Sequence, residues 1–204
     1  MVVRVLRCQY RMESRYRPAN RVRVPIRNMV LLMAQNQNDN SREFSVSTQN
    51  SLVAAGWYPG RNVWGKIKLP SKMCIHPRAA IILTEFGGLK VGKVCSGIDF
   101  VCCDVNFTPT LNNTGYQGIR YFSECIGSSL YPIAVFENGH CDLLVDEQGR
   151  TYLSYADLEP FTLTFARALE SLLHGRLDNQ QELFDAGMKL VAWPDNDVIH
   201  RYDD

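Results

Sequence analysis

Three short apolar segments, separated only by turn signals, limit the possible folds more than any other feature of this sequence. They lie at 133–137, 141–145 and 150–155 and contain the apolar and β-branched residues that strands favour. Asn138-Gly139 is a hairpin signal between the first two, and 146–149 supplies turn residues between the second and the third. Connections this short join antiparallel neighbours, so we predict an antiparallel meander rather than an alternating parallel fold.

The rest of the chain is expected to supply helices and two further strands. Segment 163–174 places Phe165, Leu169 and Leu172 on one helical face and ends at Gly175. The order of the elements predicts a single α+β domain whose antiparallel sheet is packed by helices. The expected helices span about 48–55, with Ser47 as N-cap, 77–86, 117–126, 163–174 and 178–190; the further strands span 89–94 and 98–105, and a long loop follows at 106–118.

The charges are distributed unevenly along the chain. Residues 1–33 contain eight arginines and one acid, a net charge of +7, whereas residues 34–204 contain 14 basic and 20 acidic side chains, a net charge of −6. An Arg-rich, acid-poor N-terminus resembles a transit peptide or a nucleic-acid-binding arm. The absence of any helical or strand period favours instead a disordered arm, or a start of translation at Met29 or Met33. We therefore expect an arm at 1–42 and a folded domain at 43–204.

Composition and cysteine usage indicate a globular protein in a reducing compartment. Hydrophobic residues make up 46% and charged residues 21% of the chain, and no apolar run is long enough for a membrane-spanning helix. The seven cysteines are odd in number and include no Cys-x-x-Cys pair, so we interpret them as buried free thiols in the cytoplasm. Neither Cys74 with His76 nor His140 with Cys141 has a specific ligand spacing, so no bound metal is expected.

No motif for catalysis or for cofactor binding is found in the sequence. Residues 87–93 come close to a phosphate-binding loop, but the next residue lacks the hydroxyl that such a loop needs, and the expected order of strand and helix is reversed. Cys125 or Cys141 with His140 or His174 leaves a Cys-His hydrolase as an alternative, although nothing in their spacing pairs them. We expect no cofactor and no enzyme activity.

The turn that follows the first helix suggests a structural role for two of its residues. Trp57 is expected in the core, because a large aromatic residue at a helix exit usually packs the next segment down. Arg61 is expected either to be solvated or to hold a buried carboxylate or a row of carbonyl groups through its planar fork.

Five blocks of sequence resemble the third family of the SUKH superfamily in order and spacing. Residues 55–63 are similar to its Gly-Trp-x-Pro-Gly-Arg signature and 83–89 to its helix that ends in Phe-Gly-Gly-Leu. Further blocks lie at 131–134, 146–152 and 165–175, and the resemblance covers 44–175. The matched residues, which we expect to be structural rather than contacts to a partner, are Gly56, Trp57, Pro59, Gly60, Arg61, Phe86, Gly87, Gly88, Leu89, Pro132, Gly149, Leu169 and Gly175.

This resemblance implies a SUKH-like fold and a non-catalytic role in a bacterial cell. SUKH proteins are similar to immunity proteins that bind and block the toxin domain of a polymorphic or contact-dependent toxin system, and many such toxins are nucleases or nucleic-acid deaminases. The expected partner is then a cognate toxin domain, with neither a membrane nor nucleic acid bound directly. The charge of −6 suits a basic toxin surface. A regulatory interaction scaffold of the wider superfamily is the alternative, followed by the Cys-His hydrolase.

Overall fold

The sheet consists of six antiparallel strands, each paired with its neighbours in sequence. The computed structural model describes residues 44–70, 72–111 and 113–193. The predicted α+β fold with an antiparallel sheet is confirmed, and the arm expected at 1–42 lies outside the described residues. In sheet order the strands are β1 (Lys90–Val91), β2 (Val105–Asn106), β3 (Leu130–Phe136), β4 (Cys141–Asp146), β5 (Thr151–Ser154) and β6 (Leu158–Thr162).

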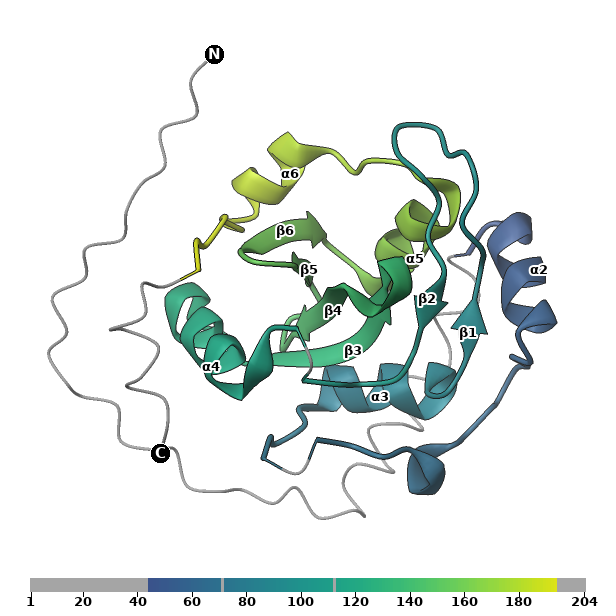
Figure 1. Ribbon diagram of the computed structural model, residues 1–204, viewed down its shortest axis with the longest axis horizontal. Coiled ribbons are helices and arrows are strands. Elements are labelled where there is room, and N and C mark those ends of the chain that lie inside the picture. The colour runs from purple at the N-terminus through teal and green to yellow at the C-terminus, as the bar shows by residue number, and fades with distance from the viewer. Residues whose placement is uncertain (1–43, 71, 112, 194–204) are drawn as a thin grey trace, which may run out of the picture.

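Helices cover both faces of this sheet. The cluster of apolar side chains on one face includes residues of α2, α3 and α5, and the cluster on the other face includes residues of α4 and α6 (Figure 1). The helices of the described part of the chain are α2 (Val46–Ala54), α3 (Pro77–Phe86), α4 (Gly115–Ile126), α5 (Phe165–His174) and α6 (Gln180–Asp185), with short 3-10 turns η2 (Trp64–Lys66) and η3 (Glu137–Gly139).

Strand β4 shows how two cores arise from one sheet. Successive side chains of a strand point to opposite faces, so Leu143 and Val145 join the first cluster and Leu144 joins the second. All six residues of β4 are buried, as expected for a strand that is covered on both sides. Helices on both faces thus enclose the centre of the sheet.

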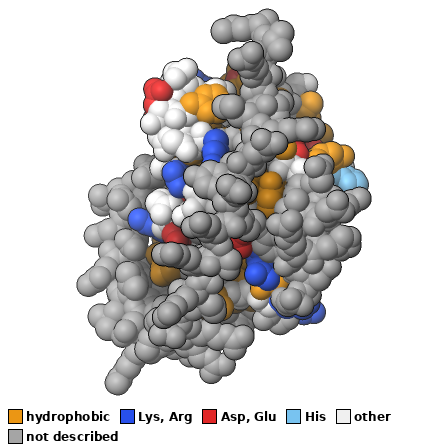
Figure 2. All heavy atoms as spheres, turned by 90° about the vertical axis from the view of Figure 1, so that its left-hand side faces the viewer, with side chains coloured by type: hydrophobic (Ala, Val, Ile, Leu, Met, Phe, Trp, Pro, Cys, Tyr) orange, Lys and Arg blue, Asp and Glu red, His pale blue; other side chains and the backbone are white. Residues whose placement is uncertain are grey.

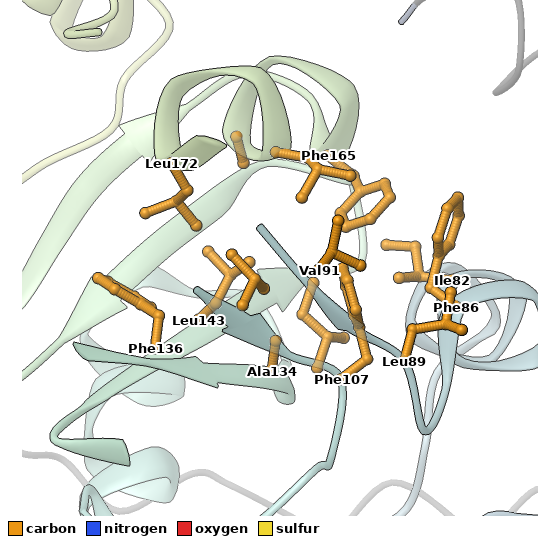
Figure 3. Packing of buried hydrophobic residues seen from close by; sticks show 14 of the residues in the cluster. Ile82, Phe86, Leu89, Val91, Phe107, Ala134, Phe136, Leu143, Phe165 and Leu172 are labelled. Carbon is orange, nitrogen blue, oxygen red and sulfur yellow. The ribbon is translucent and has the colours of Figure 1, made fainter. Parts of the chain in front are cut away.

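An aromatic cluster joins α3, α5 and the end of β2. Phe86, Phe107 and Phe165 contact one another with ring centroids 5.0 to 5.9 Å apart, and Figure 3 shows the three side chains converging from their separate elements. Aromatic pairs at this separation contribute about 0.5–1.5 kcal/mol each beyond the area that they bury. This cluster fixes the position of the C-terminal end of α3.

The strand predicted at 98–105 is wrong over most of its length. Only Val105–Asn106 is a strand, because the N–H groups of Ile98, Asp99 and Phe100 donate to the last carbonyl groups of α5, at His174 and Gly175. These 2.7–3.2 Å bonds take the segment out of the sheet and dock it on the helix end. The expected strand at 89–94 is likewise shortened to Lys90–Val91.

Strand β6 was not anticipated, and several expected helix bounds were inaccurate. Glu159 and Pro160 obscure a strand pattern, but β6 is the last strand of the sheet, where a proline removes no ladder hydrogen bond to a further strand. The expected helix at 178–190 ends at Asp185. The N-cap of α2 is Ser45 rather than Ser47, since the Ser45 hydroxyl accepts the Thr48 N–H at 3.2 Å.

Candidate protein-interaction surface

A long connection between α2 and α3 is tied to the molecule by two residues of the turn that follows α2. The guanidinium of Arg61 donates one hydrogen bond to the carbonyl oxygen of Glu85 and a second, of 2.9 Å, to that of Gly87. These carbonyls lie at the C-terminal end of α3, where a cation also meets the negative end of the helix dipole. Of the roles stated for Arg61, the structure shows the one in which its fork binds carbonyl groups.

Trp57 makes the second attachment. Its ring is buried, and its indole N–H donates to the Glu85 carboxylate at 3.0 Å. Burial raises the pKa of the Glu85 carboxyl, and the hydrogen bond from Trp57 partly opposes that shift. Trp57 thus binds a side chain, and Arg61 binds backbone carbonyl groups, at the same C-terminal turn of α3.

The remaining family-motif residues lie at turns, helix ends and core positions. Pro59 and Gly60 form a turn closed by a 3.1 Å bond from the Arg61 N–H to the Tyr58 carbonyl. Gly87, Gly88 and Leu89 lead from α3 into β1. The others are Gly56, which follows the end of α2; Phe86 and Leu169, which are fully buried; Pro132, beside a register shift between β3 and β4; Gly149, in the β4–β5 turn; and Gly175, which ends α5.

His76 occupies the other end of the connection and has a capping role that the sequence did not reveal. It is the N-cap of α3, where Nδ1 accepts the Ala79 N–H at 3.3 Å, while Nε2 lies 3.1 Å from the Val145 carbonyl oxygen. A ring that accepts at Nδ1 and donates at Nε2 is neutral. Burial lowers the pKa of His76 below the ordinary 6.5, which favours that form.

The connection and the first residues of α3 present an exposed basic surface, which we call the basic strap and define as the described residues of 57–78. It contains Arg61, Lys66, Lys68, Lys72 and Arg78 and not one Asp or Glu. Arg61 is used at the end of α3, but the other four are exposed, and none of them forms an ion pair with another described residue. The only regular structure in the described part of the connection is the 3-10 turn η2, and connections this long are uncommon and often functional.

The basic surface continues onto α4. The Lys72 ammonium lies 6.0 Å from the centroid of the Tyr116 ring, and the Arg120 guanidinium lies 5.7 Å from the same centroid. Figure 2, which views the molecule from the α4 side, shows Lys and Arg side chains next to hydrophobic ones on the part of this face that is coloured. With Tyr58, which is 57% exposed, the surface combines cations and aromatic rings; Tyr and Arg are enriched at protein interfaces, whereas Lys is depleted there.

Several acidic side chains, in contrast to the cations of the strap, are buried or form ion pairs. Asp142 and Asp146 are fully buried, and Asp104, Asp178 and Glu182 form ion pairs with Lys90 or Arg167. Across the described residues there are 12 basic and 14 acidic side chains, and four of the acids counted in the −6 lie at 195–204, outside them. The described surface is therefore not acidic as a whole, and its unpaired charge at the strap is positive.

Two of the side chains considered for catalysis, Cys141 and His174, have structural surroundings. Cys141 is 5% exposed, and burial raises the pKa of its thiol well above the usual range, so it is protonated at neutral pH. Burial likewise raises the pKa of Cys103 to about 11. His174 lies 3.0 Å from the Thr48 hydroxyl, a contact that joins α5 to α2, and 3.2 Å from the carboxylate of Glu170 on its own helix.

The expectation that the cysteines are buried was wrong for two of them. All six described cysteines are free, but Cys74 and Cys95 are exposed. No group of three or more His, Cys, Asp or Glu side chains suited to a metal ion occurs among the described residues. In the same part of the chain, no helix has the length and hydropathy needed to cross a membrane.

Comparison with protein families identifies the class to which this arrangement belongs. Residues 44–175 match the SUKH-3 immunity protein family, which confirms the resemblance noted in the sequence. Because the match covers about two thirds of the chain, the protein belongs to the SUKH-3 immunity protein family. No match is found among curated proteins or among solved structures.

Proposed function

We propose that this protein is a non-catalytic immunity protein that binds the toxin domain of a cognate polymorphic or contact-dependent toxin in the cytoplasm. Membership of the SUKH-3 immunity protein family is the observation that carries the proposal. The protonated Cys141 thiol and the structural contacts of His76 and His174 support inhibition by occupancy rather than by turnover. The activity of the toxin, for example on nucleic acid, belongs to the partner.

We further propose that the toxin domain contacts the basic strap with an acidic surface. The strap exposes Lys66, Lys68, Lys72 and Arg78 without ion pairs to described residues, so their charge is available to a partner. Its attachment at both ends by Arg61 and His76 limits the ordering that binding would require. The motif residues, including those at the start of the strap, then serve as scaffold, while the exposed cations of the strap are free to vary with the partner.

Titration of toxin activity tests the immunity role. A candidate cognate toxin domain is assayed against increasing amounts of the full chain. We expect inhibition to be complete at about one immunity protein per toxin and independent of incubation time, because a blocking partner acts by mass action. Folded variants Cys125→Ser, Cys141→Ser, His140→Ala and His174→Ala should protect equally well. Sub-stoichiometric protection that one of these variants abolishes would establish an enzyme instead, and binding without inhibition would favour a scaffold.

Charge reversal tests the surface. The double variant Lys66→Glu/Lys68→Glu should lower the association rate about tenfold or more, because electrostatic complementarity acts mainly on association. Its matched control is Lys93→Glu/Lys189→Glu, which makes the same change in net charge at exposed lysines outside the strap. The difference should shrink as salt rises past about 0.15 M, where the Debye length is roughly 8 Å. Equal rates for the two variants would place the contact elsewhere.

A further inference from the structure

The connection between β1 and β2, residues 92–104, brings two cysteines face to face. Cys95 and Cys102 are partners in an isolated antiparallel bridge, and the Cys102 N–H donates to the Cys95 carbonyl oxygen at 2.9 Å. Residues directly opposite each other in an antiparallel pair have Cα atoms about 4.5–5.5 Å apart. Disulfides span Cα separations of about 4.4–6.8 Å, so the backbone already lies within their range.

The two thiols differ in accessibility, and the Cys102 thiol donates to the Ser96 carbonyl oxygen at 3.4 Å. A hydrogen bond with the Cys95 side chain raises the pKa of Cys102. Cys95 is exposed, whereas Cys102 is only 4% exposed. Cys103 does not compete for the bond, since its side chain belongs to the main core cluster and its N–H donates to the Leu172 carbonyl oxygen of α5. The pair therefore has one thiol open to solution and one thiol held behind it.

We propose that Cys95 and Cys102 are a redox-modification site that takes small disulfides, such as glutathione disulfide, and forms a reversible cross-strand disulfide. The Cys95 thiolate attacks the small disulfide, forms a mixed disulfide and releases one thiol. The Cys102 thiolate then attacks Cys95 Sγ, which closes the protein disulfide and releases the second small thiol. Two electrons and the two protein thiol protons leave with the two small thiols, so the small disulfide is the oxidant.

The bond would tie down an exposed apolar loop. Val94, Ile98 and Val101 flank the pair, and Ile98 is 71% exposed. The loop is attached to α5 by the N–H groups of Ile98, Asp99 and Phe100, and Asp99 also accepts the Leu177 N–H at 2.9 Å. A covalent link across its base would make opening of this docked loop rarer. Amide hydrogen exchange at 98–100 should then be slower in the oxidised protein than in the reduced protein.

The experiment equilibrates the full chain with glutathione buffers of increasing oxidised fraction and traps free thiols before peptide mass analysis. We expect a loss of two hydrogens within the peptide that contains Cys95 and Cys102, reversed by excess reduced glutathione, together with slower exchange at 98–100. Cys95→Ser, a change at an exposed side chain, should abolish the loss, whereas Cys74→Ser, at another exposed cysteine, should not. A glutathione adduct on Cys95 that persists in the wild-type protein, or a disulfide between other cysteines, would overturn the proposal.

Discussion

Arg61 stabilises the C-terminal end of α3 with two N–H groups of one planar guanidinium. A lysine at this position carries a single ammonium group on a flexible stem and cannot reproduce that fork. We expect Arg61→Lys to lower the free energy of unfolding by about 1–2 kcal/mol, in line with the loss of a charge-assisted hydrogen bond. Urea titration measures the change; identical midpoints and slopes for the two proteins would show that the bonds contribute nothing.

His76 makes stability depend on pH with a sign that the structure determines. Burial holds the pKa of the folded state below the 6.5 of a free histidine, so the unfolded chain takes up the proton first as the pH falls. The free energy of unfolding should therefore be fully retained above about pH 6.5 and should decrease as the pH falls below that value.

His76→Asn is the matching variant for this titration, because asparagine is a good N-cap and does not titrate in this range. Denaturant titrations between about pH 7 and pH 5.5 should show a shallower loss of stability for the variant than for the wild-type protein. The other histidines are common to both proteins and cancel in the comparison. Parallel curves would mean that His76 titrates alike in the folded and unfolded states.

The residues of the candidate site could be predicted from the sequence only in part. The turn at Pro59-Gly60 and the burial of Trp57 follow from local chemistry, and both are present in the structure. The partners of Arg61 lie 24 and 26 residues away, at a helix end, so its role could be stated only as one of several. His76 gave no signal as an N-cap, because histidine is not among the residues that ordinarily take this position.

At the scale of elements, the docking of the 92–104 connection on α5 depends on close backbone contact. A Cβ atom added to Gly175 would lie 2.0 Å from the Phe100 carbonyl oxygen and 2.8 Å from the Gly97 Cα. Without this contact, residues 98–105 have the β-branched composition of a strand, which is what the sequence predicts. The packing of two glycines against each other overrides that local preference.

Two glycines that end helices in the same backbone conformation provide a test of this contact. Gly175 has φ +59° and Gly127 has φ +68°, but a Cβ at Gly127 meets nothing within 4 Å. Gly127→Ala should cost only the left-handed conformation, about 1–2 kcal/mol. Gly175→Ala should cost on the order of 3 kcal/mol or more, because the loop must also move. Thermal unfolding of both variants measures the two losses of stability. Equal losses would show that the loop moves away from Gly175 at no cost in free energy.

At the scale of the whole molecule, the distribution of charge along the chain differs from the distribution of charge on the folded surface. The sequence divides into a basic segment at 1–33 and an acidic remainder of −6. In the folded region two of the acids are buried and three are paired with Lys90 or Arg167. Exposed acids such as Glu137 and Glu159 lie in other segments, which leaves the basic strap as a local surface of unpaired positive charge. A count along the chain cannot anticipate this, because pairing depends on which elements meet.

The N-terminal arm provides the prediction at this scale. Residues 1–33 carry a net charge of +7 and no apolar period, so they offer little surface to bury against the domain. Deleting them should change the melting temperature by less than a few degrees and leave expression intact. Differential scanning calorimetry of the full chain and of the shortened chain provides the measurement. A larger fall would show that the arm packs on the folded domain.

The sequence alone was sufficient for the α+β class, the antiparallel meander of β3 to β5, the approximate positions of the helices along the chain and the family. These follow from periodicity, turn residues and motif spacing, all of which are local along the chain. Only the tertiary structure decided that 98–101 leaves the sheet for the end of α5, that Arg61 binds the carbonyls of α3, and that Cys95 faces Cys102. Each of these features depends on contacts between segments that are distant in the sequence. The competing local arrangements differ by only a few hydrogen bonds, so tertiary packing decides between them.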